Sequence, residues 1–288
     1  MTGNSLYADY METAIYNALM ASLKADASQI AKYSPLEGWR HEGEEQCGMH
    51  INCCNANGPR AFAMIPQFAY QVQDDCVRVN FYAPSEAELV LPGKKPVRLK
   101  QTTDYPRTDQ IEIEVDPAKE TAFTIALRIP AWSKIAVVSV NGQPQDGVLQ
   151  GAYLPVNRKW KKGDRITVKL DLRARLVERN QAQAIVRGPI VLARDSRFGD
   201  GFVDEASVVV SKDGYVALTP VKAPGFAWLA FTAPMVLGTD LESNRAPKQI
   251  HFCDFASAGN TWDKTQRYRV WLPKTLNVMH SPYRPYNQ

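Results

Sequence analysis

The chain concentrates its soft metal ligands and nucleophiles in one stretch, residues 47–60, which reads Cys-Gly-Met-His-Ile-Asn-Cys-Cys-Asn-Ala-Asn-Gly-Pro-Arg. This stretch holds three of the five cysteines and one of the four histidines. Zinc in proteins is bound by cysteine, histidine and carboxylate side chains in tetrahedral geometry. The candidate ligands are Cys47, His50, Cys53 and Cys54, with Glu42, Glu44 and Glu45 just upstream. Their spacing favours a metal site, although an adjacent cysteine pair departs from the two separated pairs of most structural zinc sites.

Two other interpretations of the Cys53-Cys54 doublet stay open from the residues alone. A thiolate is a strong nucleophile, and a helix N-terminus or a bound metal favours the thiolate over the thiol. Gly58-Pro59 is a helix-start signal, because proline fits the first helical position. A helix predicted over residues 60–70 would therefore direct its positive end at the doublet. The remaining interpretation is that both cysteines are ordinary half-buried thiols in a loop.

The composition is that of a globular chain, and it excludes some classes of function. The 34 basic and 30 acidic residues among 288 give a net charge of +4, too mild for a nucleic-acid partner. No apolar run approaches the roughly 20 residues that a membrane-spanning helix needs, so no membrane partner is expected. No secretory signal is predicted at the N-terminus, which leaves periplasm and cytoplasm of a bacterium open as compartments. Cys76 and Cys253 have strand-like apolar neighbours and are predicted to be buried, inert thiols.

One amphipathic helix is predicted ahead of the cysteines, over residues 5–23. Its apolar residues recur at the spacing of a single buried face; they are Leu6, Tyr7, Tyr10, Met11, Ala14, Ile15, Ala18 and Leu19. Glu12 lies close to that face, either as an edge residue in water or as a carboxylate that points into a cavity. Tyr33 follows in a stretch that Pro35 makes extended. One such helix and one short helix cannot enclose a core, so their apolar faces need partners.

From residue 71 onward the sequence reads as short alternating strands separated by turns. Turn signals include Pro92-Gly93, Asp116-Pro117, Asn141-Gly142 and Gly163-Asp164. This spacing is typical of a β-sandwich or jelly roll, with Trp132 and Trp160 as core or edge aromatic residues. Residues 183–192 are predicted as one apolar strand, and a charged, glycine-rich break over 195–204 indicates a second, smaller β unit.

Several motifs together resemble glycoside hydrolase family 127, which includes β-L-arabinofuranosidases. Those in the first 82 residues are Tyr7-Ala-Asp-Tyr-Met-Glu-Thr-Ala-Ile-Tyr-Asn17, Tyr33-Ser-Pro-Leu36, Cys53-Cys-Asn-Ala-Asn-Gly-Pro-Arg60 and Val79-Asn-Phe-Tyr82. In the β part they are Leu127-Arg-Ile-Pro-Ala-Trp132, Val140-Asn-Gly142, Arg187-Gly-Pro189 and Gly259-Asn-Thr-Trp262. A neighbouring arabinofuranosidase family shares this architecture. The doublet, followed by Asn-Ala-Asn and Arg, is the most specific of the motifs.

The resemblance implies a fold and a set of domains. The family's (α/α)6 barrel is followed by β-sandwich domains. The expected fold class is therefore mostly β, with an incomplete helical remnant of an (α/α)6 barrel followed by two β-sandwich, jelly-roll-like units. Residues 1–70 would be the barrel remnant, 71–182 a β-sandwich, and 183–288 the second β domain.

The resemblance also implies a mechanism and its residues. Family members cleave glycosides with retention, using a zinc-bound cysteine thiolate as the nucleophile, and three cysteines and a glutamate hold the zinc. By position, Cys53 matches the nucleophile and a zinc ligand, and Cys54 matches a second zinc ligand. Glu12 and Tyr33 match sugar contacts, and the expected substrate is an arabinofuranoside-containing glycan.

The chain also departs from the family pattern. In the family the acid/base glutamate, the zinc glutamate and the third zinc cysteine lie well upstream of the doublet, and none of these motifs occurs in the 52 residues before Cys53. Retaining cleavage needs an acid that protonates the leaving oxygen. The chain is therefore expected to be the C-terminal portion of a β-L-arabinofuranosidase-like enzyme. It would be inactive by itself, or active with a missing barrel half on another chain.

Two alternatives belong to other functional classes. The chain could be a non-catalytic carbohydrate-binding β-sandwich module with Trp228, Trp262 and Trp271 as its aromatic platform. It could instead be a structural or interaction module whose β units brace a barrel. An exposed apolar face on the helix over residues 5–23 would be the mark of that structural role.

Overall fold

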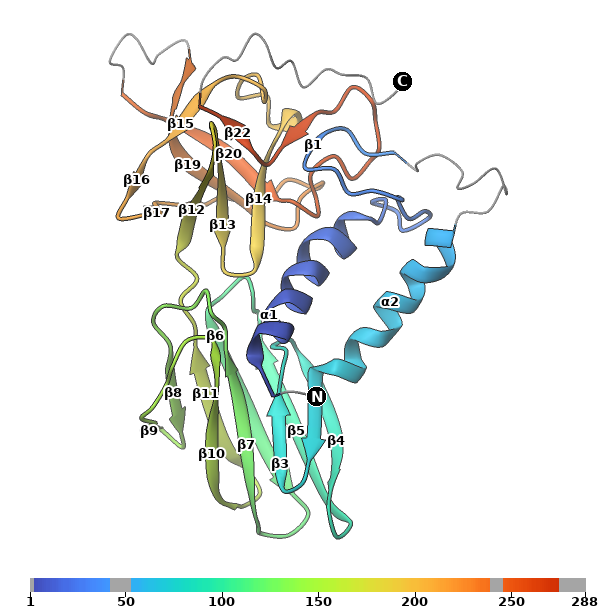
Figure 1. Ribbon diagram of the computed structural model, residues 1–288, viewed down its shortest axis with the longest axis vertical. Helices are drawn as coiled ribbons and strands as arrows, with labels where there is room; N and C mark the ends of the chain where they lie inside the picture. The colour runs from blue at the N-terminus through green and yellow to red at the C-terminus, as the bar shows by residue number, and fades with distance from the viewer. Residues whose placement is uncertain (1–2, 42–52, 239–245, 275–288) are drawn as a thin grey trace. The chain divides into compact units, whose positions relative to one another are not determined.

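The computed structural model describes residues 3–41, 53–238 and 246–274, and this part of the chain is mostly β-strand with few helices (Figure 1). It forms two compact units. The first unit comprises Met1–Leu19, His50–Leu172 and Gly188–Ile190; the second comprises Met20–Met49, Arg173–Arg187 and Val191–Gln288. The expected three-segment division at residues 70 and 182 stays a prediction.

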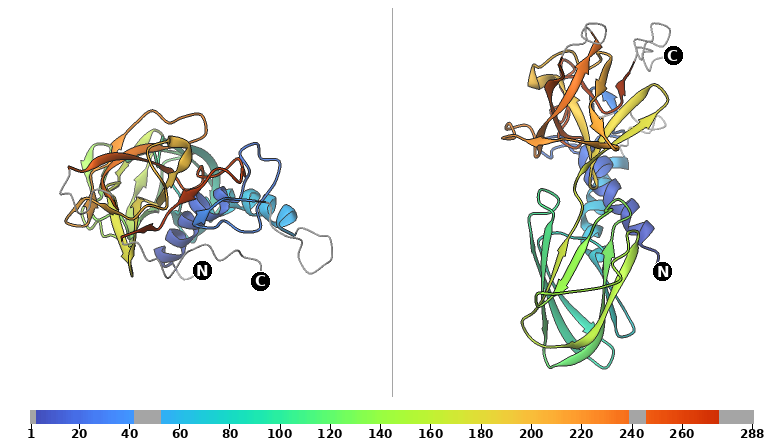
Figure 2. Two further views of the ribbon diagram at one scale, coloured as in Figure 1. Left: turned by 90° about the horizontal axis from the view of Figure 1, so that it is seen from above. Right: turned by 90° about the vertical axis from the view of Figure 1, so that its left-hand side faces the viewer.

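The first unit contains two β-sheets, whose strands run along its length (Figures 1 and 2). The four-stranded sheet, in the order β10-β7-β3-β2, consists of β2 (Tyr70–Gln73), β3 (Cys76–Val79), β7 (Thr121–Ile129) and β10 (Ala152–Trp160). The six-stranded sheet, in the order β4-β5-β6-β11-β8-β9, consists of β4 (Ser85–Leu91), β5 (Lys95–Thr103), β6 (Gln110–Pro117), β8 (Val137–Val140), β9 (Gln143–Pro144) and β11 (Asp164–Lys169). In the described residues, strand β3 pairs parallel with β7, and the other neighbouring strands of these two sheets pair antiparallel.

Both sheets of the first unit contribute to one hydrophobic core. Alternate residues of each strand are buried, as expected for a sheet with one face covered; examples are Val77 and Val79 in β3 and Ile111 and Ile113 in β6. Trp132 and Trp160 belong to this core with 8% and 0% of their surface exposed, which confirms the sequence-based expectation for both. The Asn141-Gly142 turn also forms as predicted, because both residues have positive φ and join β8 to β9.

The second unit contains a sheet that is larger than either sheet of the first unit and combines long and short strands. In the described residues its main path has the order β15-β19-β20-β14-β13-β12-β17-β16. These strands are β12 (Ala174–Arg179), β13 (Ala182–Arg187), β14 (Ile190–Asp195), β15 (Ser207–Val209), β16 (Ser211–Lys212), β17 (Tyr215–Val216), β19 (Ala230–Leu237) and β20 (Lys248–Asp254). Short strands join it off this path: β1 (Glu37–Gly38), β18 (Thr219–Pro220), β21 (Tyr268–Arg269) and β22 (Leu272–Pro273). A 3₁₀ turn, η2 (Ser196–Phe198), follows β14.

The single strand predicted over residues 183–192 is wrong, because the structure divides it into β13 and β14. The break falls at Gly188, whose φ of +56° does not continue a strand. A Cβ at this position would lie 2.5 Å from Cδ2 of Leu172, so the chain also approaches the first unit's core too closely there for any larger residue. The sequence pattern also missed β12, whose alternation is interrupted by arginines.

The helix predicted over residues 5–23 is shorter and faces the other way. It consists of α1 (Ser5–Ala14), capped by the Asn4 side chain, and a π-helical turn, η1 (Ile15–Leu19). The apolar face predicted to be buried is largely exposed: Leu6, Tyr7 and Tyr10 are 39%, 58% and 63% exposed. The buried side chains are instead mostly polar, and they are Ser5, Ala8, Asp9, Glu12 and Asn17.

No helix in the ranges that the structure describes has the length and apolar character needed to cross a membrane.

Replacing Gly259 with alanine should strongly destabilise the second unit. Gly259 has a φ of +60°, and a Cβ there would lie 2.5 Å from Cδ1 of the buried Tyr268 ring. Left-handed strain and a ring clash together should cost about 3 kcal/mol of unfolding free energy. The matched control is Gly214→Ala, which has a φ of +77° but no atom within 4 Å of the new Cβ. It should lose only about 1 kcal/mol in denaturant unfolding; equal losses for both variants would contradict the steric explanation.

Candidate functional site

The Cys53-Cys54 doublet lies in the first turn of the described part of α2 (Cys53–Ala69), which leads directly into β2 (Figure 1). The prediction that the helix starts at Pro59 is wrong, since Pro59 and Pro66 both lie inside it. Each proline removes one hydrogen bond to the carbonyl four residues earlier, a loss that an exposed helix tolerates because water replaces the donor. Both cysteines are half-buried, and the Asn57 amide donates to the Cys53 carbonyl at 3.0 Å.

Helix α2 is poorly covered by the rest of the described chain. Gly58 is its one fully buried residue among those described, and Met64 is 37% exposed. Phe62, Ile65 and Phe68 recur on one side of the helix and are only half-buried. The doublet therefore stands at the positive end of a helix whose apolar side is incompletely packed.

The described residues do not by themselves fit a complete zinc site. A closed site needs four ligands, and no three His, Cys, Asp or Glu side chains are grouped for a metal in residues 3–41, 53–238 and 246–274. Consecutive residues on a helix project about 100° apart, so Cys53 and Cys54 offer two thiols with different directions. The other candidate ligands, Cys47, His50, Glu42, Glu44 and Glu45, lie outside the described residues.

Glu12 lies in a buried ion-pair cluster in the first unit. Nη1 of Arg128 contacts Oδ1 of Asp9 at 2.5 Å, and Nη2 contacts Oε1 of Glu12 at 2.7 Å. The Arg128 side chain is 0% exposed, and Glu12 is 2% exposed. Oδ2 of Asp9 accepts the backbone N–H of Ala131 at 2.9 Å. Among the described residues, Oε2 of Glu12 is buried and receives no hydrogen bond.

Tyrosine side chains and backbone carbonyls complete this cluster. Tyr105 donates its hydroxyl to Oε1 of Glu12 at 2.9 Å, and Nε of Arg128 donates to the Asn80 carbonyl at 2.5 Å. Tyr82 donates to the Arg128 carbonyl at 2.6 Å and lies against the guanidinium. Burial, together with the nearby Glu12 carboxylate, raises the pKa of Tyr105 well above its ordinary value. Both hydroxyls therefore stay protonated and act as donors.

The cluster explains why α1 turns its polar side inward. A buried guanidinium destabilises the folded state unless carboxylates pair with it and carbonyls accept its hydrogen bonds. Asp9 and Glu12 can both pair with it because residues three apart share one face of a helix. The sequence analysis placed Glu12 near a cavity but missed Asp9 and Arg128. The signals were a carboxylate pair at helical spacing and an arginine inside the apolar run of β7. Asp9 and Glu12 lie in one of the motifs quoted above, and Arg128 lies in another.

Tyr33, the other expected sugar contact, belongs to the second unit. Its side chain is 65% exposed, and Nζ of Lys32 lies 5.4 Å from the centre of its ring. Glu12 and the doublet belong to the first unit on different helices, and the Glu12 side chain is directed at Arg128. The assignments of Cys53, Cys54, Glu12 and Tyr33 to catalysis, zinc and sugar stay predictions.

The remaining described cysteines differ in burial. Cys253 is 0% exposed, and burial raises the pKa of its thiol well above the ordinary value, with Asp254 and Asp195 adding to the effect. Cys76 is half-buried rather than buried, because it alternates with the core residues Val77 and Val79 in β3. Desolvation also raises the pKa of Cys76. The burial predicted for Cys253 is therefore confirmed, whereas the burial predicted for Cys76 is wrong. That both thiols are inert stays a prediction.

Two family models match the chain. Residues 1–67 match the catalytic domain of the GH127 β-L-arabinofuranosidases, and residues 76–172 match the middle domain of the same family. A curated relative, a non-reducing end β-L-arabinofuranosidase of Bifidobacterium longum subsp. longum, is 27% identical over 212 residues. That alignment covers 64% of this chain and 31% of the relative.

Solved structures share the fold over nearly the whole chain. A GH127 β-L-arabinofuranosidase from Geobacillus stearothermophilus T6 superposes with a TM-score of 0.78 at 22% identity, covering 94% of this chain and 47% of that structure. A further GH127 β-arabinofuranosidase gives a TM-score of 0.79 at 24% identity, covering 95% of this chain and 46% of the other. The chain thus spans about a third of the curated relative and about half of the solved structures.

Replacing Arg128 with methionine should greatly destabilise the first unit. The change leaves two buried carboxylates without their guanidinium, which typically costs about 3–5 kcal/mol. Arg98 provides the matched control: it pairs with Glu86 and Asp116 at 2.9 and 2.7 Å, but its side chain is 39% exposed. Arg98→Met should cost about 0–1 kcal/mol in urea unfolding. A loss for Arg128→Met as small as that of Arg98→Met would show that the cluster does not stabilise the unit.

The cysteines should also differ in reactivity toward iodoacetamide in the native chain. At about pH 8.5 an ordinary exposed thiol is half ionised, but Cys253 is inaccessible and stays protonated. Peptide mass spectrometry should therefore find Cys53 and Cys54 alkylated well before Cys253, which reacts only after unfolding in urea. Alkylation of native Cys253 at the rate of Cys54 would be inconsistent with its burial.

Proposed function

Because the chain belongs to glycoside hydrolase family 127, of which it carries part of the catalytic domain and the middle domain, we propose that it forms part of a retaining β-L-arabinofuranosidase. Its substrate would be a glycan that contains arabinofuranoside. The observation that carries the proposal is the catalytic-domain match over residues 1–67, which includes the doublet at the helix N-terminus. The names of the Bifidobacterium and Geobacillus relatives support the same sugar class.

In this proposal Cys53 is the nucleophile. Its thiolate attacks the anomeric carbon, the bond to the leaving oxygen breaks, and an acid gives that oxygen a proton. Water, deprotonated by the same group, then cleaves the thioglycosyl bond and regenerates the thiolate.

We assign zinc binding to Cys53 and Cys54. In this chain Cys47 or one of the nearby glutamates, which lie outside the described residues, would stand in for the zinc ligands that the family has upstream. Bound zinc would keep both thiols deprotonated. Glu12 and Tyr33 are assigned to the sugar. For Glu12 the acceptor left for a sugar hydroxyl is Oε2, since Oε1 already faces Arg128 and Tyr105.

The proton donor would come from outside these 288 residues. Asp9 and Glu12, the buried carboxylates of α1, hold Arg128 and do not serve as the acid. We assign that role to a carboxyl group on the remainder of the catalytic domain, which the family resemblance puts upstream of the doublet. This remainder would be the partner that completes the (α/α)6 barrel around α1 and α2.

The exposed apolar side of α1 supports that partnership and favours a bracing role for the β units. Tyr7 and Tyr10 are 58% and 63% exposed, and apolar side chains exposed together on one helix face mark an interaction surface. In this view the two helices are the barrel remnant. The segments over residues 71–182 and 183–288 are then β-sandwich domains that carry it.

The metal assignment predicts that the purified chain, stripped of metal and then given zinc, retains a stoichiometric amount after desalting. Cys53→Ser and Cys54→Ser should each abolish retention, because each removes one of the two thiolate ligands. Cys76→Ser is the matched control and should retain zinc, since Cys76 lies on β3 away from the helix. Zinc is measured by atomic emission. If Cys53→Ser retains as much zinc as the unmodified chain, the assignment of zinc to Cys53 is wrong.

The acid assignment makes a separate prediction about activity. The 288-residue chain loaded with zinc should not hydrolyse an aryl β-L-arabinofuranoside, because the proposal places the acid that protonates the leaving oxygen outside this chain. Release of the aryl group should be followed over hours against a no-protein blank. Turnover that depends on Cys53 would place the acid within this chain and overturn that part of the proposal.

A further inference from the structure

The catalytic-domain match and the compact units divide the chain differently. The match runs continuously over residues 1–67, but residues 20–41, which include Tyr33, fold as part of the second unit. Apart from the helical residues Met20 and Ala21, an isolated bridge between Leu23 and Ile30, and the two-residue strand β1, their backbone is irregular. A stretch with so little internal structure is held in place by what it contacts.

The principal contact is made by Arg40, which is 0% exposed. Nη1 donates to the carbonyls of Ala21 and Ala256 at 2.9 and 2.8 Å, and Nη2 donates to the carbonyl of Phe255. The guanidinium carbon lies 4.8 Å from the ring centre of Phe255 and 5.0 Å from that of Tyr268. Arg40 therefore joins both ends of residues 20–41 to the loop after β20.

Neighbouring contacts hold the part of the segment next to Tyr33. Tyr268 donates its hydroxyl to the Pro35 carbonyl at 2.5 Å, and the Val270 N–H donates to the Leu36 carbonyl at 2.8 Å. Strand β1 pairs with β21, and Glu37 forms an ion pair with Arg269 at 2.6 Å. Every residue from Pro35 to Gly38 is thus tied to the second unit by its backbone or side chain.

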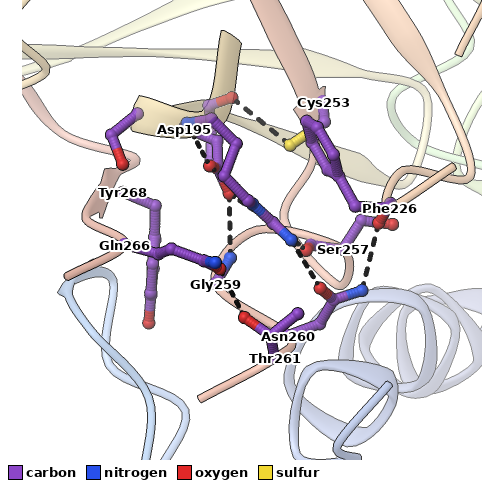
Figure 3. Close-up of polar contacts among 12 residues, drawn as sticks. Asp195, Phe226, Cys253, Ser257, Gly259, Asn260, Thr261, Gln266 and Tyr268 are labelled. Carbon is purple, nitrogen blue, oxygen red and sulfur yellow. Dashed lines mark hydrogen bonds and ion pairs between the residues drawn. The ribbon is translucent and has the colours of Figure 1, made fainter. Parts of the chain in front are cut away.

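The loop that contacts residues 20–41 is itself held by hydrogen bonds (Figure 3). Asp195 accepts the Gly259 N–H at 2.9 Å, and Arg197 donates to Asn260 at 2.9 Å. The side-chain amide of Asn260 donates to the Phe226 carbonyl at 3.1 Å. The backbone carbonyl of Asn260 accepts the Ala25 N–H at 2.9 Å. Gly259 lets this loop pass against the ring of Tyr268, where a Cβ would collide.

We infer that the second unit acts as the positioning platform for Tyr33, with Arg40 as the positioning residue. The inference rests on the proposed function, in which Tyr33 contacts the sugar. An exposed aromatic ring on an irregular segment binds well only when its backbone is already fixed, because ordering it on binding would cost affinity. The guanidinium fork fixes it by reaching three carbonyls at once, which a lysine ammonium on a flexible stem cannot reproduce.

Hydrogen exchange followed by mass spectrometry tests the platform directly in the 288-residue chain. Arg40→Ala should raise exchange in peptides from residues 31–41 by on the order of tenfold or more, and peptides from residues 76–172 should not change. Arg40→Lys should fail to restore protection. The matched control is Arg194→Ala, which removes another buried arginine of the second unit that contacts Asp200 and the carbonyl of Phe202. It should not expose residues 31–41 selectively.

Should Arg40→Ala fail to fold, Tyr268→Phe removes only the hydroxyl that bonds Pro35, and it should raise exchange in the same peptides. Unchanged protection of residues 31–41 in the folded Arg40 or Tyr268 variant, or full rescue by Arg40→Lys, would overturn the inference.

A second measurement separates this inference from the proposed function. Binding of methyl β-L-arabinofuranoside is followed by saturation-transfer NMR with the unmodified chain, Tyr33→Ala and Arg40→Lys. Weakened binding in both variants supports positioning of the sugar contact. No binding by the unmodified chain, with the exchange result intact, would count against Tyr33 as a sugar contact while leaving the platform in place.

Discussion

The buried guanidinium of Arg128 is the constraint on which the first unit depends. Removing such a charge from water costs several kcal/mol of folding free energy unless the charge is paired and hydrogen-bonded. Its partners are two carboxylates on α1 and the carbonyl of Asn80. Only one orientation of α1 brings Asp9 and Glu12 to Arg128 together. The helix is thereby fixed to β7 through its polar side, which reverses the usual arrangement of an amphipathic helix on a sheet.

This reversal has a consequence for function. With its polar residues committed to the β unit, α1 turns Tyr7 and Tyr10 outward, and α2 likewise leaves most of its surface uncovered. Two helices fixed at their inner side and apolar on their outer side are arranged to join further helices. In the proposed function, the remainder of the catalytic domain would supply such helices.

Arg40 is also a buried arginine, in the second unit, but in the described residues its hydrogen-bond partners are not carboxylates. Its guanidinium donates to backbone carbonyls and lies between two aromatic rings, and burial lowers its pKa. Because carbonyls are fixed in the backbone, this arrangement holds an irregular segment to a loop rather than a helix to a strand. The two buried arginines thus secure, each within its own unit, the stretches that carry Glu12 and Tyr33.

The sequence by itself determined the family, the predominance of β-strands, the Asn141-Gly142 turn and the core positions of Trp132 and Trp160. These follow from local periodicity, turn chemistry and motifs, which depend on neighbours in the chain. Only the tertiary structure decided which side of α1 is buried, that residues 183–192 form two strands, and that residues 20–41 fold with the second unit. Each depends on a partner far away in sequence: Arg128 for α1, Leu172 for Gly188, and Phe255 and Tyr268 for Arg40. Hydrophobic periodicity predicts that a helix has two sides, but a buried charge on another strand decides which side faces inward.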